Sequence, residues 1–303
     1  MSVPTPLERA PEELAGGRTV FLKREDLHEL GSFKWRGALP TFESYRRQGA
    51  TGVVTASTGN HGAAAAWAGA RLGMRAVVFA PATASAAKLA VVERFGADVH
   101  LVGADLDEAK AEARRVAADR RMPFFEDGAE RAQYEAYGAI ADEIFEQLED
   151  SIAAVVAPLG NGALLGGIGI AVCRRSPETE RVGVVAKGAP VMAESWEAGH
   201  AVECPRCDTF ADGLAVRVAI PFALDVLGEV ATRVLRVSER ELASAVGAFA
   251  RNGIRVEGAA AAALAALPQV EGDGRALVLV VTGRNIDDDV FTRAVERPES
   301  FPD

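Results

Sequence analysis

At 303 residues the chain is long enough for two domains with a well-buried core, and its 49% hydrophobic and 25% charged residues are typical of a soluble globular protein. The formal net charge of −10 argues against a nucleic acid or an anionic membrane as partner, because both repel an acidic surface. The N-terminal residues 1–15 have neither the basic region nor the apolar run of a signal peptide, and the weakly polar run at 160–173 is too short and glycine-rich to span a bilayer. We therefore expect a cytoplasmic protein.

Short β-branched runs alternate with longer helical patterns along the chain. Strands are predicted at 19–22, 52–55, 76–80, 98–102, 153–157, 182–186 and 276–281. Helices are predicted between them, at 62–73, 85–95, 106–121, 133–148, 164–175, 238–252 and 258–267. Buried strands that are followed by helices imply right-handed βαβ units, so we expect an α/β fold with mainly parallel, twisted sheets flanked by helices.

The domain organisation follows from the spacing of these elements. Residues 51–125 contain a compact set of βαβ units of their own, which predicts a small inserted α/β domain. The large domain is then built from 1–50 and 126–303. The segment 187–217 shows no clear periodicity and is expected to run irregularly over the surface.

The three cysteines are Cys173, Cys204 and Cys207. Cys204-Pro205-Arg206-Cys207 has the spacing of half a zinc ribbon, but no second cysteine pair and no histidine pair completes it. We expect reduced thiols in an ordinary loop and no metal ion.

A lysine between aromatic residues is the first candidate for chemistry. Lys34 lies in Gly31-Ser32-Phe33-Lys34-Trp35-Arg36-Gly37-Ala38. Removal of water around such a side chain favours the neutral amine, which is a nucleophile toward an aldehyde. The alternative is a surface lysine at the start of a helix.

A second loop follows the predicted strand 52–55. Its sequence, Thr55-Ala56-Ser57-Thr58-Gly59-Asn60-His61-Gly62, leads into an alanine-rich helix. Hydroxyls and backbone amides at a helix N-terminus form a site for an anion such as a carboxylate. The alternative is that Ser57 or Thr58 only caps the helix.

A third loop, Ala157-Pro158-Leu159-Gly160-Asn161-Gly162-Ala163-Leu164, again lies between a strand and a helix. Small residues let successive backbone amides surround a phosphate. The loop lacks the Lys-Ser/Thr ending of a nucleoside-triphosphate loop and the spacing of a dinucleotide fingerprint. A carbonyl-reactive lysine, a carboxylate site and a monophosphate site together indicate pyridoxal 5'-phosphate acting on an amino acid.

In these three loops the chain resembles the fold type II pyridoxal-phosphate-dependent enzymes, which share the tryptophan synthase beta-like fold. It is most similar to their threonine/serine dehydratase and serine racemase branch. Two later segments, 209–213 and 281–285, extend the resemblance from Pro4 to Phe291. The resemblance implies a two-domain enzyme that forms a homodimer.

The resemblance also implies roles for individual residues. Lys34 would bond to the cofactor aldehyde, Phe33 would cover one ring face, and Asn60 would bind the 3-hydroxyl. Thr282 would place its hydroxyl at the pyridine nitrogen. The phosphate would be bound by Gly160, Asn161, Gly162, Ala163 and Leu164. The substrate carboxylate would be bound by Ser57, Thr58, Gly59, Asn60 and His61.

The activity implied by the resemblance is α,β-elimination, which converts L-threonine or L-serine to a 2-oxo acid and ammonia. In racemases of this family a serine occupies the position of Thr58, on the ring face opposite the lysine, so a racemase with Thr58 as second acid/base is an alternative. A β-replacement synthase is another, as is a lyase for a larger or acidic hydroxy amino acid, which Arg284 could pair with. A different class altogether is a catalytically inactive scaffold of this fold.

The sequence departs from the family pattern at several positions. Ala186-Lys187 stands where relatives often have a carboxylate that binds a divalent cation, so no metal site is expected. Asn161 replaces a glycine of the phosphate loop, but asparagine tolerates left-handed backbone better than most residues, so the loop can still bind a phosphate. Glu257 and Asp212 lie near the cofactor in relatives, but a helix N-terminus and a turn explain them as well.

Overall fold

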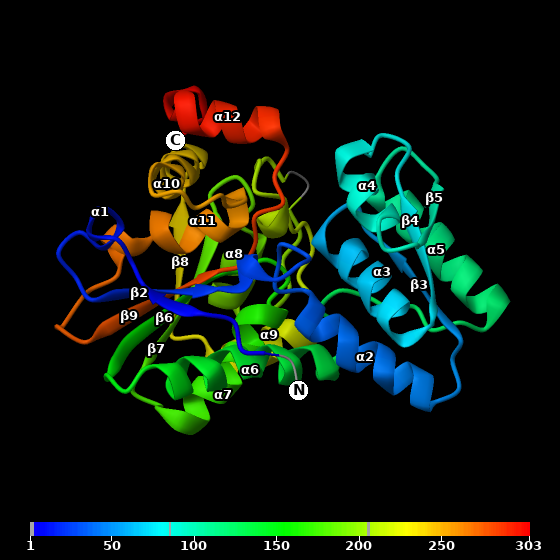
Figure 1. The fold of residues 1–303 in the computed structure, drawn as a ribbon, viewed down its shortest axis with the longest axis horizontal. Coiled ribbons are helices and arrows are strands. Elements are labelled where there is room, and N and C mark those ends of the chain that lie inside the picture. The colour runs from blue at the N-terminus through cyan, green and yellow to red at the C-terminus, as the bar shows by residue number, and fades with distance from the viewer. Residues whose placement is uncertain (1–2, 85, 205–206) are drawn as a thin grey trace. The chain divides into compact units, whose positions relative to one another are not determined.

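The computed structural model describes residues 3–84, 86–204 and 207–303. It consists of two compact units (Figure 1). The larger comprises the residues up to Gly31 together with Tyr137–Asp303, and the smaller is Ser32–Ala136. The smaller unit therefore begins and ends outside the expected range of 51–125. One reason is α2 (Trp35–Arg47), which packs against α3 (Asn60–Leu72) with the rings of Trp35 and Trp67 edge to face at 6.3 Å.

The larger unit is built on a six-stranded sheet. Each neighbouring pair of strands is parallel except the first, β1 with β2, so the prediction of a mainly parallel α/β fold is confirmed. In spatial order the strands are β1 (Leu7–Arg9), β2 (Val20–Arg24), β9 (Ala276–Val281), β6 (Ile152–Pro158), β7 (Glu180–Ala186) and β8 (Arg233–Val237).

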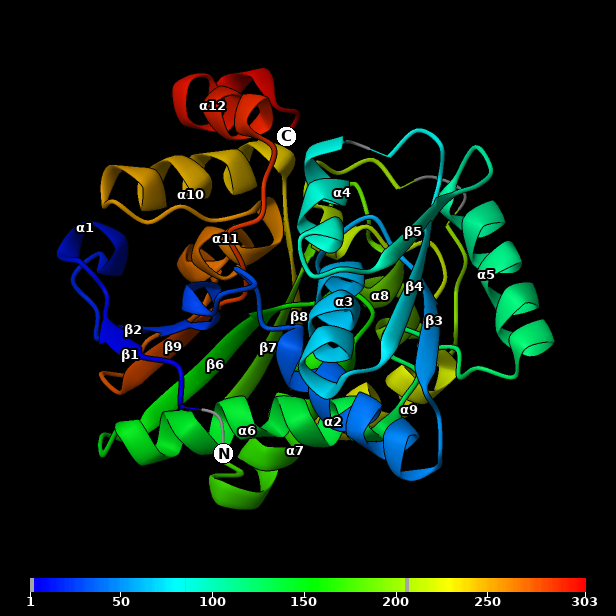
Figure 2. The ribbon, with the colours of Figure 1, turned by 45° about the vertical axis from the view of Figure 1, so that its right-hand side comes forward.

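Helices cover both faces of this sheet (Figures 1 and 2). On one side lies α11 (Gly258–Ala265), which is buried along its whole length because alanine side chains allow close approach to the strands. Beyond it lie α10 (Glu239–Arg251) and α12 (Asp288–Glu296). The other side carries α7 (Ala163–Arg175) and α6 (Arg131–Gln147), which belongs to this unit from Tyr137 onward. The remaining helices of the unit are α1 (Glu12–Ala15), α8 (Val191–Ala198) and α9 (Pro221–Val230).

The smaller unit has a parallel three-stranded sheet of β3 (Gly52–Ala56), β4 (Arg75–Ala80) and β5 (Asp98–Leu101). In Figure 2, α3 and α4 (Ala86–Glu93) lie on one face of this sheet and α5 (Leu106–Arg120) on the other. Phe124 pairs with Val54 of β3 in a short parallel bridge. This pairing brings the chain that follows α5 back to the carboxyl end of β3.

The seven predicted strands and seven predicted helices are present, with ends that differ by a few residues. The irregular course predicted for 187–217 is wrong in part, because α8 lies within it. Strands β1 and β8 were not predicted, since β1 is very short and β8 is a half-exposed edge strand without a continuous apolar run. Ser85, at the predicted start of α4, and Pro205 and Arg206 of the cysteine motif lie outside the described residues.

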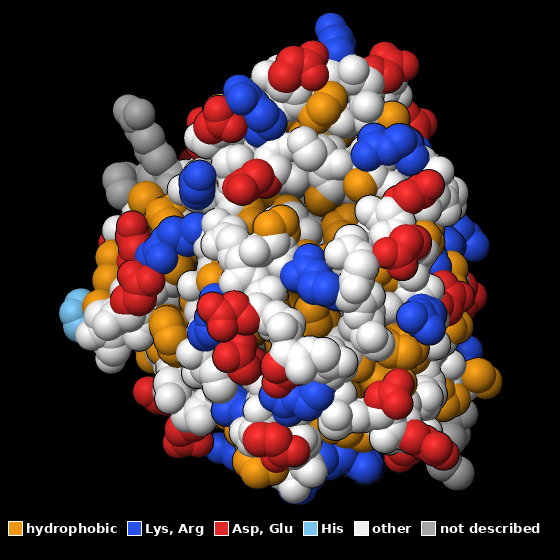
Figure 3. Space-filling view, turned by 90° about the vertical axis from the view of Figure 1, so that its left-hand side faces the viewer, with side chains coloured by type: hydrophobic (Ala, Val, Ile, Leu, Met, Phe, Trp, Pro, Cys, Tyr) orange, Lys and Arg blue, Asp and Glu red, His pale blue; other side chains and the backbone are white. Residues whose placement is uncertain are grey.

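Three further features concern the surface charge, the cysteines and the lengths of the helices. Figure 3 shows one face of the larger unit, on which acidic and basic side chains are interspersed. Cys173, Cys204 and Cys207 are free thiols. Among the described residues, no helix has the length and apolar composition needed to cross a membrane.

Candidate active site

Lys34 is held by a carboxylate of its own unit. It precedes the first residue of α2, and its Nζ lies 2.7 and 2.6 Å from the two carboxylate oxygens of Asp127. Only 13% of the lysine side chain is exposed, and its Nζ lies 5.0 Å from the centroid of the Phe33 ring. The alternative of an exposed surface lysine is therefore wrong. The amine lies in a shielded site, directly beside a carboxylate.

His61 adjoins the same carboxylate. Its Nδ1 lies 3.5 Å from Oδ1 of Asp127, and its Nε2 lies 3.0 Å from Oγ1 of Thr55 and 3.2 Å from the carbonyl oxygen of Phe125. The imidazole stacks on the Phe125 ring at 4.3 Å. Burial lowers the pKa of His61, and the nearby Asp127 only partly opposes this effect, so the ring is neutral near pH 7.

The loop between β3 and α3 leads into a helix N-terminus that no side chain caps. The helix begins at Asn60, and the capping position is Gly59, which has no side chain. Ser57 instead accepts a hydrogen bond from the Gly59 amide at 3.1 Å, so the interpretation that Ser57 or Thr58 only caps the helix is wrong. The first amides of a helix have no partner within the helix and attract an anion.

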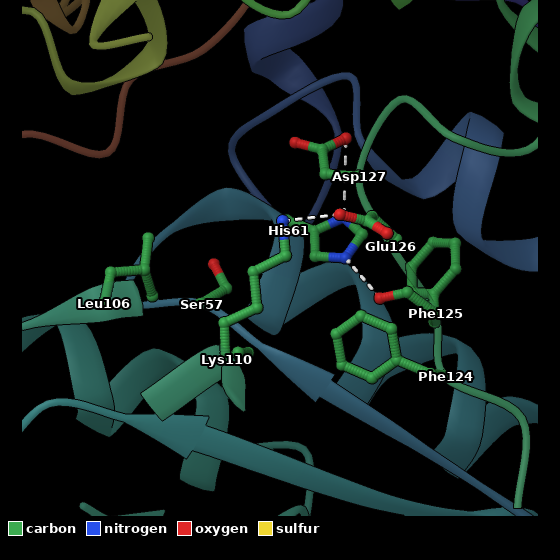
Figure 4. Close-up of a pocket in the computed structure, with 9 residues that line it drawn as sticks. Ser57, His61, Leu106, Lys110, Phe124, Phe125, Glu126 and Asp127 are labelled. Atoms are coloured by element: carbon green, nitrogen blue, oxygen red, sulfur yellow. Dashed lines mark hydrogen bonds and ion pairs between the residues drawn. The ribbon is translucent and has the colours of Figure 1, made fainter. Parts of the chain in front are cut away.

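A small cavity of about 160 Å³ lies beside this loop in the smaller unit (Figure 4). Ser57, His61 and Asp127 line it, together with the ion pair between Lys110 and Glu126. The figure shows the His61 ring between Asp127 and the Phe125 carbonyl. Two helices, α3 and α5, and two loops of one unit thus bring polar side chains to a single cavity.

In the larger unit, the glycine-rich loop joins β6 to α7. Gly162 has a positive φ of 94°, whereas Asn161 does not, so the left-handed position of the loop is occupied by a glycine and the asparagine need not adopt it. Asn161 accepts a hydrogen bond from the Ala163 amide through Oδ1 at 3.2 Å. Within the described residues, no acceptor pairs with the amides of Gly160, Asn161 and Gly162. These amides form a site that fits a phosphate group.

Thr282 directly follows β9 at the carboxyl edge of the same sheet. It is 1% exposed, and its hydroxyl has no hydrogen-bond partner among the residues that the structure describes. The Glu257 amide donates to the Gly283 carbonyl at 3.0 Å, and the Glu257 carboxylate covers that glycine. Glu257 is also the capping position of α11, so the helix interpretation fits its backbone position. Asp212 is exposed in a turn of 3-10 helix.

The residues of the two units fit pyridoxal phosphate in their chemistry. The larger unit offers three unpaired amides for a phosphate and a buried hydroxyl for a pyridine nitrogen. The smaller unit offers the Lys34 amine for an aldehyde. The buried Ser32 hydroxyl, two residues before Lys34, has no partner among the described residues and marks a further polar group available to a ligand.

Asp127 was not predicted from the sequence. The only local signal was an acidic pair, Glu126-Asp127, directly before a glycine and after the apolar run that pairs with β3. Acidic residues before a glycine are common in turns, so this signal had no specificity.

Two mainly parallel sheets flanked by helices, with a lysine at one helix start and a glycine-rich loop at a sheet edge, define an α/β enzyme of the pyridoxal-phosphate type. Residues 2–283 match the family model described as pyridoxal-phosphate dependent enzyme, and the chain belongs to this family. The predictions of the family and of the cofactor are confirmed.

Individual proteins that are similar to this chain are consistent with its membership of the family. The chain is 34% identical over 285 residues to an L-threonine ammonia-lyase of Geobacter sulfurreducens, covering 93% of this chain and 71% of that protein. It is 31% identical over 291 residues to an L-threonine ammonia-lyase of Thermotoga maritima, covering 94% and 71%. The processed form of threonine deaminase isoform 2 from Solanum lycopersicum superposes with a TM-score of 0.91 at 30% identity, covering 97% of this chain and 88% of that one. Maize serine racemase, at 24% identity and a TM-score of 0.89, shares the fold.

Proposed function

We propose that this pyridoxal-phosphate-dependent lyase eliminates water from L-threonine or L-serine and releases a 2-oxo acid and ammonia. The observation that carries the proposal is Lys34, a shielded amine beside a carboxylate and in the same unit as a helix N-terminus that no side chain caps. The relatives named L-threonine ammonia-lyase support the choice of substrate.

When bound, the cofactor supplies an electron sink for the bonds of the amino acid's α-carbon. The protein's own residues bind the substrate and the cofactor and transfer the proton. The N-terminus of α3, which no side chain caps, binds the substrate carboxylate through backbone amides. Lys34 in its neutral form takes the proton from the α-carbon as general base. The Thr282 hydroxyl is a neutral partner for the pyridine nitrogen, and the amides of Gly160, Asn161 and Gly162 hold the phosphate.

Arg284 favours a second candidate, a lyase for a hydroxy amino acid with an acidic side chain. This residue lies two positions after Thr282, is half-buried, and forms no ion pair with any described residue. A guanidinium without a partner suits a second carboxylate. If it serves this purpose, 3-hydroxyaspartate is the better substrate, and Arg284→Ala raises its KM while leaving that of L-threonine unchanged.

The test begins with the absorbance spectrum of the purified protein, followed by 2-oxo acid detection with L-threonine, L-serine and D-serine. The expected result is a visible cofactor band that is lost in Lys34→Ala, and oxo acid from the L-amino acids alone. Faster exchange of the α-proton than release of ammonia would instead indicate a racemase that uses Thr58. A stable band that changes only when a second nucleophile is added would indicate β-replacement.

The same proposal includes a homodimer that acts in the cytoplasm. Its support is the resemblance to the dehydratases. Light scattering on the eluate of a size-exclusion column measures the mass directly, and a value near that of one chain would contradict the dimer.

A further inference from the structure

Lys34, Asp127 and His61 form a contiguous row within the smaller unit. The Asp127 carboxylate lies between the other two, with both oxygens within 2.7 Å of the lysine Nζ and Oδ1 3.5 Å from Nδ1 of His61. Lys34 and His61 are largely buried, whereas the side chain of Asp127 is 30% exposed. The row therefore consists of a shielded amine, a partly exposed carboxylate and a buried imidazole, in that order.

The hydrogen-bond partners of His61 fix its tautomer. Oγ1 of Thr55 donates its hydrogen to the Phe125 carbonyl at 2.7 Å. The two atoms near Nε2, the Thr55 hydroxyl oxygen and the Phe125 carbonyl oxygen, are therefore both acceptors. Nε2 must carry the hydrogen of the neutral ring, which leaves a lone pair on Nδ1. That lone pair faces the Asp127 carboxylate, which is also an acceptor.

We propose that Asp127 and His61 form a proton-accepting pair that converts the Lys34 ammonium into the neutral amine. An N–H bond of Lys34 breaks as an O–H bond forms on Asp127. This O–H bond then breaks as an N–H bond forms at Nδ1 of His61. Lys34 becomes neutral, Asp127 is again a carboxylate, and His61 becomes a cation hydrogen-bonded to it.

The transfer conserves the charge of the row. Before it, the ammonium and the carboxylate sum to zero beside a neutral ring, and after it the imidazolium and the carboxylate sum to zero beside a neutral amine. Burying an additional charge in a shielded site would cost free energy, and the transfer avoids this because the number of charges stays the same. An imidazolium ordinarily gives up its proton more readily than an ammonium, so the state with a neutral amine is transient. The partly exposed Asp127 allows the proton to leave to solvent.

The role matters because only a neutral amine adds to an aldehyde. Asp127 and His61 are therefore positioning and proton-transfer residues for attachment of the cofactor to Lys34. The inference rests on the cofactor dependence of the family and not on the identity of the amino-acid substrate. The ion pair of Lys110 and Glu126 also borders the cavity, and its charges must be controlled in any test.

The test is the rate at which apoenzyme binds pyridoxal phosphate covalently, followed by stopped-flow absorbance at one pH near neutrality. His61→Gln keeps an amide N–H that can donate to the Phe125 carbonyl but has no basic nitrogen. Asp127→Asn keeps the shape and loses the proton acceptor. Each variant is expected to slow attachment by about a hundredfold or more, the scale on which a positioned acid or base acts. Glu126→Gln removes a neighbouring carboxylate and is expected to stay within about twofold of the wild type.

The simplest competing role is that Asp127 only holds Lys34 as an ammonium. Asp127→Asn would then speed attachment and His61→Gln would leave it unchanged, and this pair of results would overturn the proposal. Nitrogen-15 NMR of the His61 ring in the apoenzyme gives a second readout. Hydrogen on Nε2 is expected, and hydrogen on Nδ1 in the neutral ring would equally overturn the proposal, even if Asp127→Asn failed to fold. Neither measurement uses an amino-acid substrate. Both therefore remain valid tests even if the protein turns out not to be a dehydratase.

Discussion

Gly160→Ala tests the role of the glycine-rich loop most directly. A β-carbon at this position would lie 2.2 Å from the carbonyl oxygen of Gly213, whereas ordinary contacts begin at 3.4 Å. The obstacle is backbone, so no side chain can rotate away, and two loops must separate by more than an ångström. Forced overpacking of this kind costs about 1–3 kcal/mol of unfolding free energy.

The displacement also moves the three amides proposed to hold the phosphate. We therefore expect Gly160→Ala to weaken pyridoxal phosphate binding by about tenfold, equivalent to the loss of one hydrogen bond to a charged group. Urea denaturation of the apoenzyme measures the stability, and titration of the cofactor absorbance measures the binding. Gly228→Ala is the matched control, because a β-carbon there meets nothing within 4 Å. Wild-type stability and affinity in Gly160→Ala would refute the reasoning.

Three further predictions concern stability, each measured by urea denaturation. Glu143→Gln removes the charge that faces the fully buried Lys23 at 2.6 Å and is expected to cost at least about 2 kcal/mol, while the exposed Glu146→Gln costs less than about 0.5 kcal/mol. Ser238→Ala breaks the capping box of α10, in which the hydroxyl accepts from the Glu241 amide, and should cost about 1 kcal/mol, whereas no loss would contradict the cap. The pKa of His61 lies below its ordinary value in the folded state, so the unfolded chain binds more protons as the pH falls below about 6.5. Apoenzyme stability should therefore decrease below that pH, and the decrease should be smaller in His61→Gln; an identical pH dependence in both proteins would exclude His61 as its source.

The sequence by itself was sufficient to predict the fold class and the cofactor. The buried strands are short continuous apolar runs, and the predicted strand 276–281 has the same ends as β9. The three loops are local segments, each between a strand or turn and a helix, so residue type and order alone indicate an amine, an anion site and a phosphate site. Local pattern was also enough to predict that the sheets are mainly parallel.

Only the tertiary structure revealed which groups act on Lys34. Asp127 lies 93 positions away in the sequence and reaches Lys34 because Phe124 pairs with β3. The tautomer of His61 likewise depends on Thr55 and Phe125, which come from different segments. The contact that forbids a side chain at Gly160 is made by Gly213, far along the chain. Periodicity and motif spacing describe neighbours along the chain, whereas protonation and steric exclusion depend on neighbours in space, and these are set by how the strands pair and the helices pack.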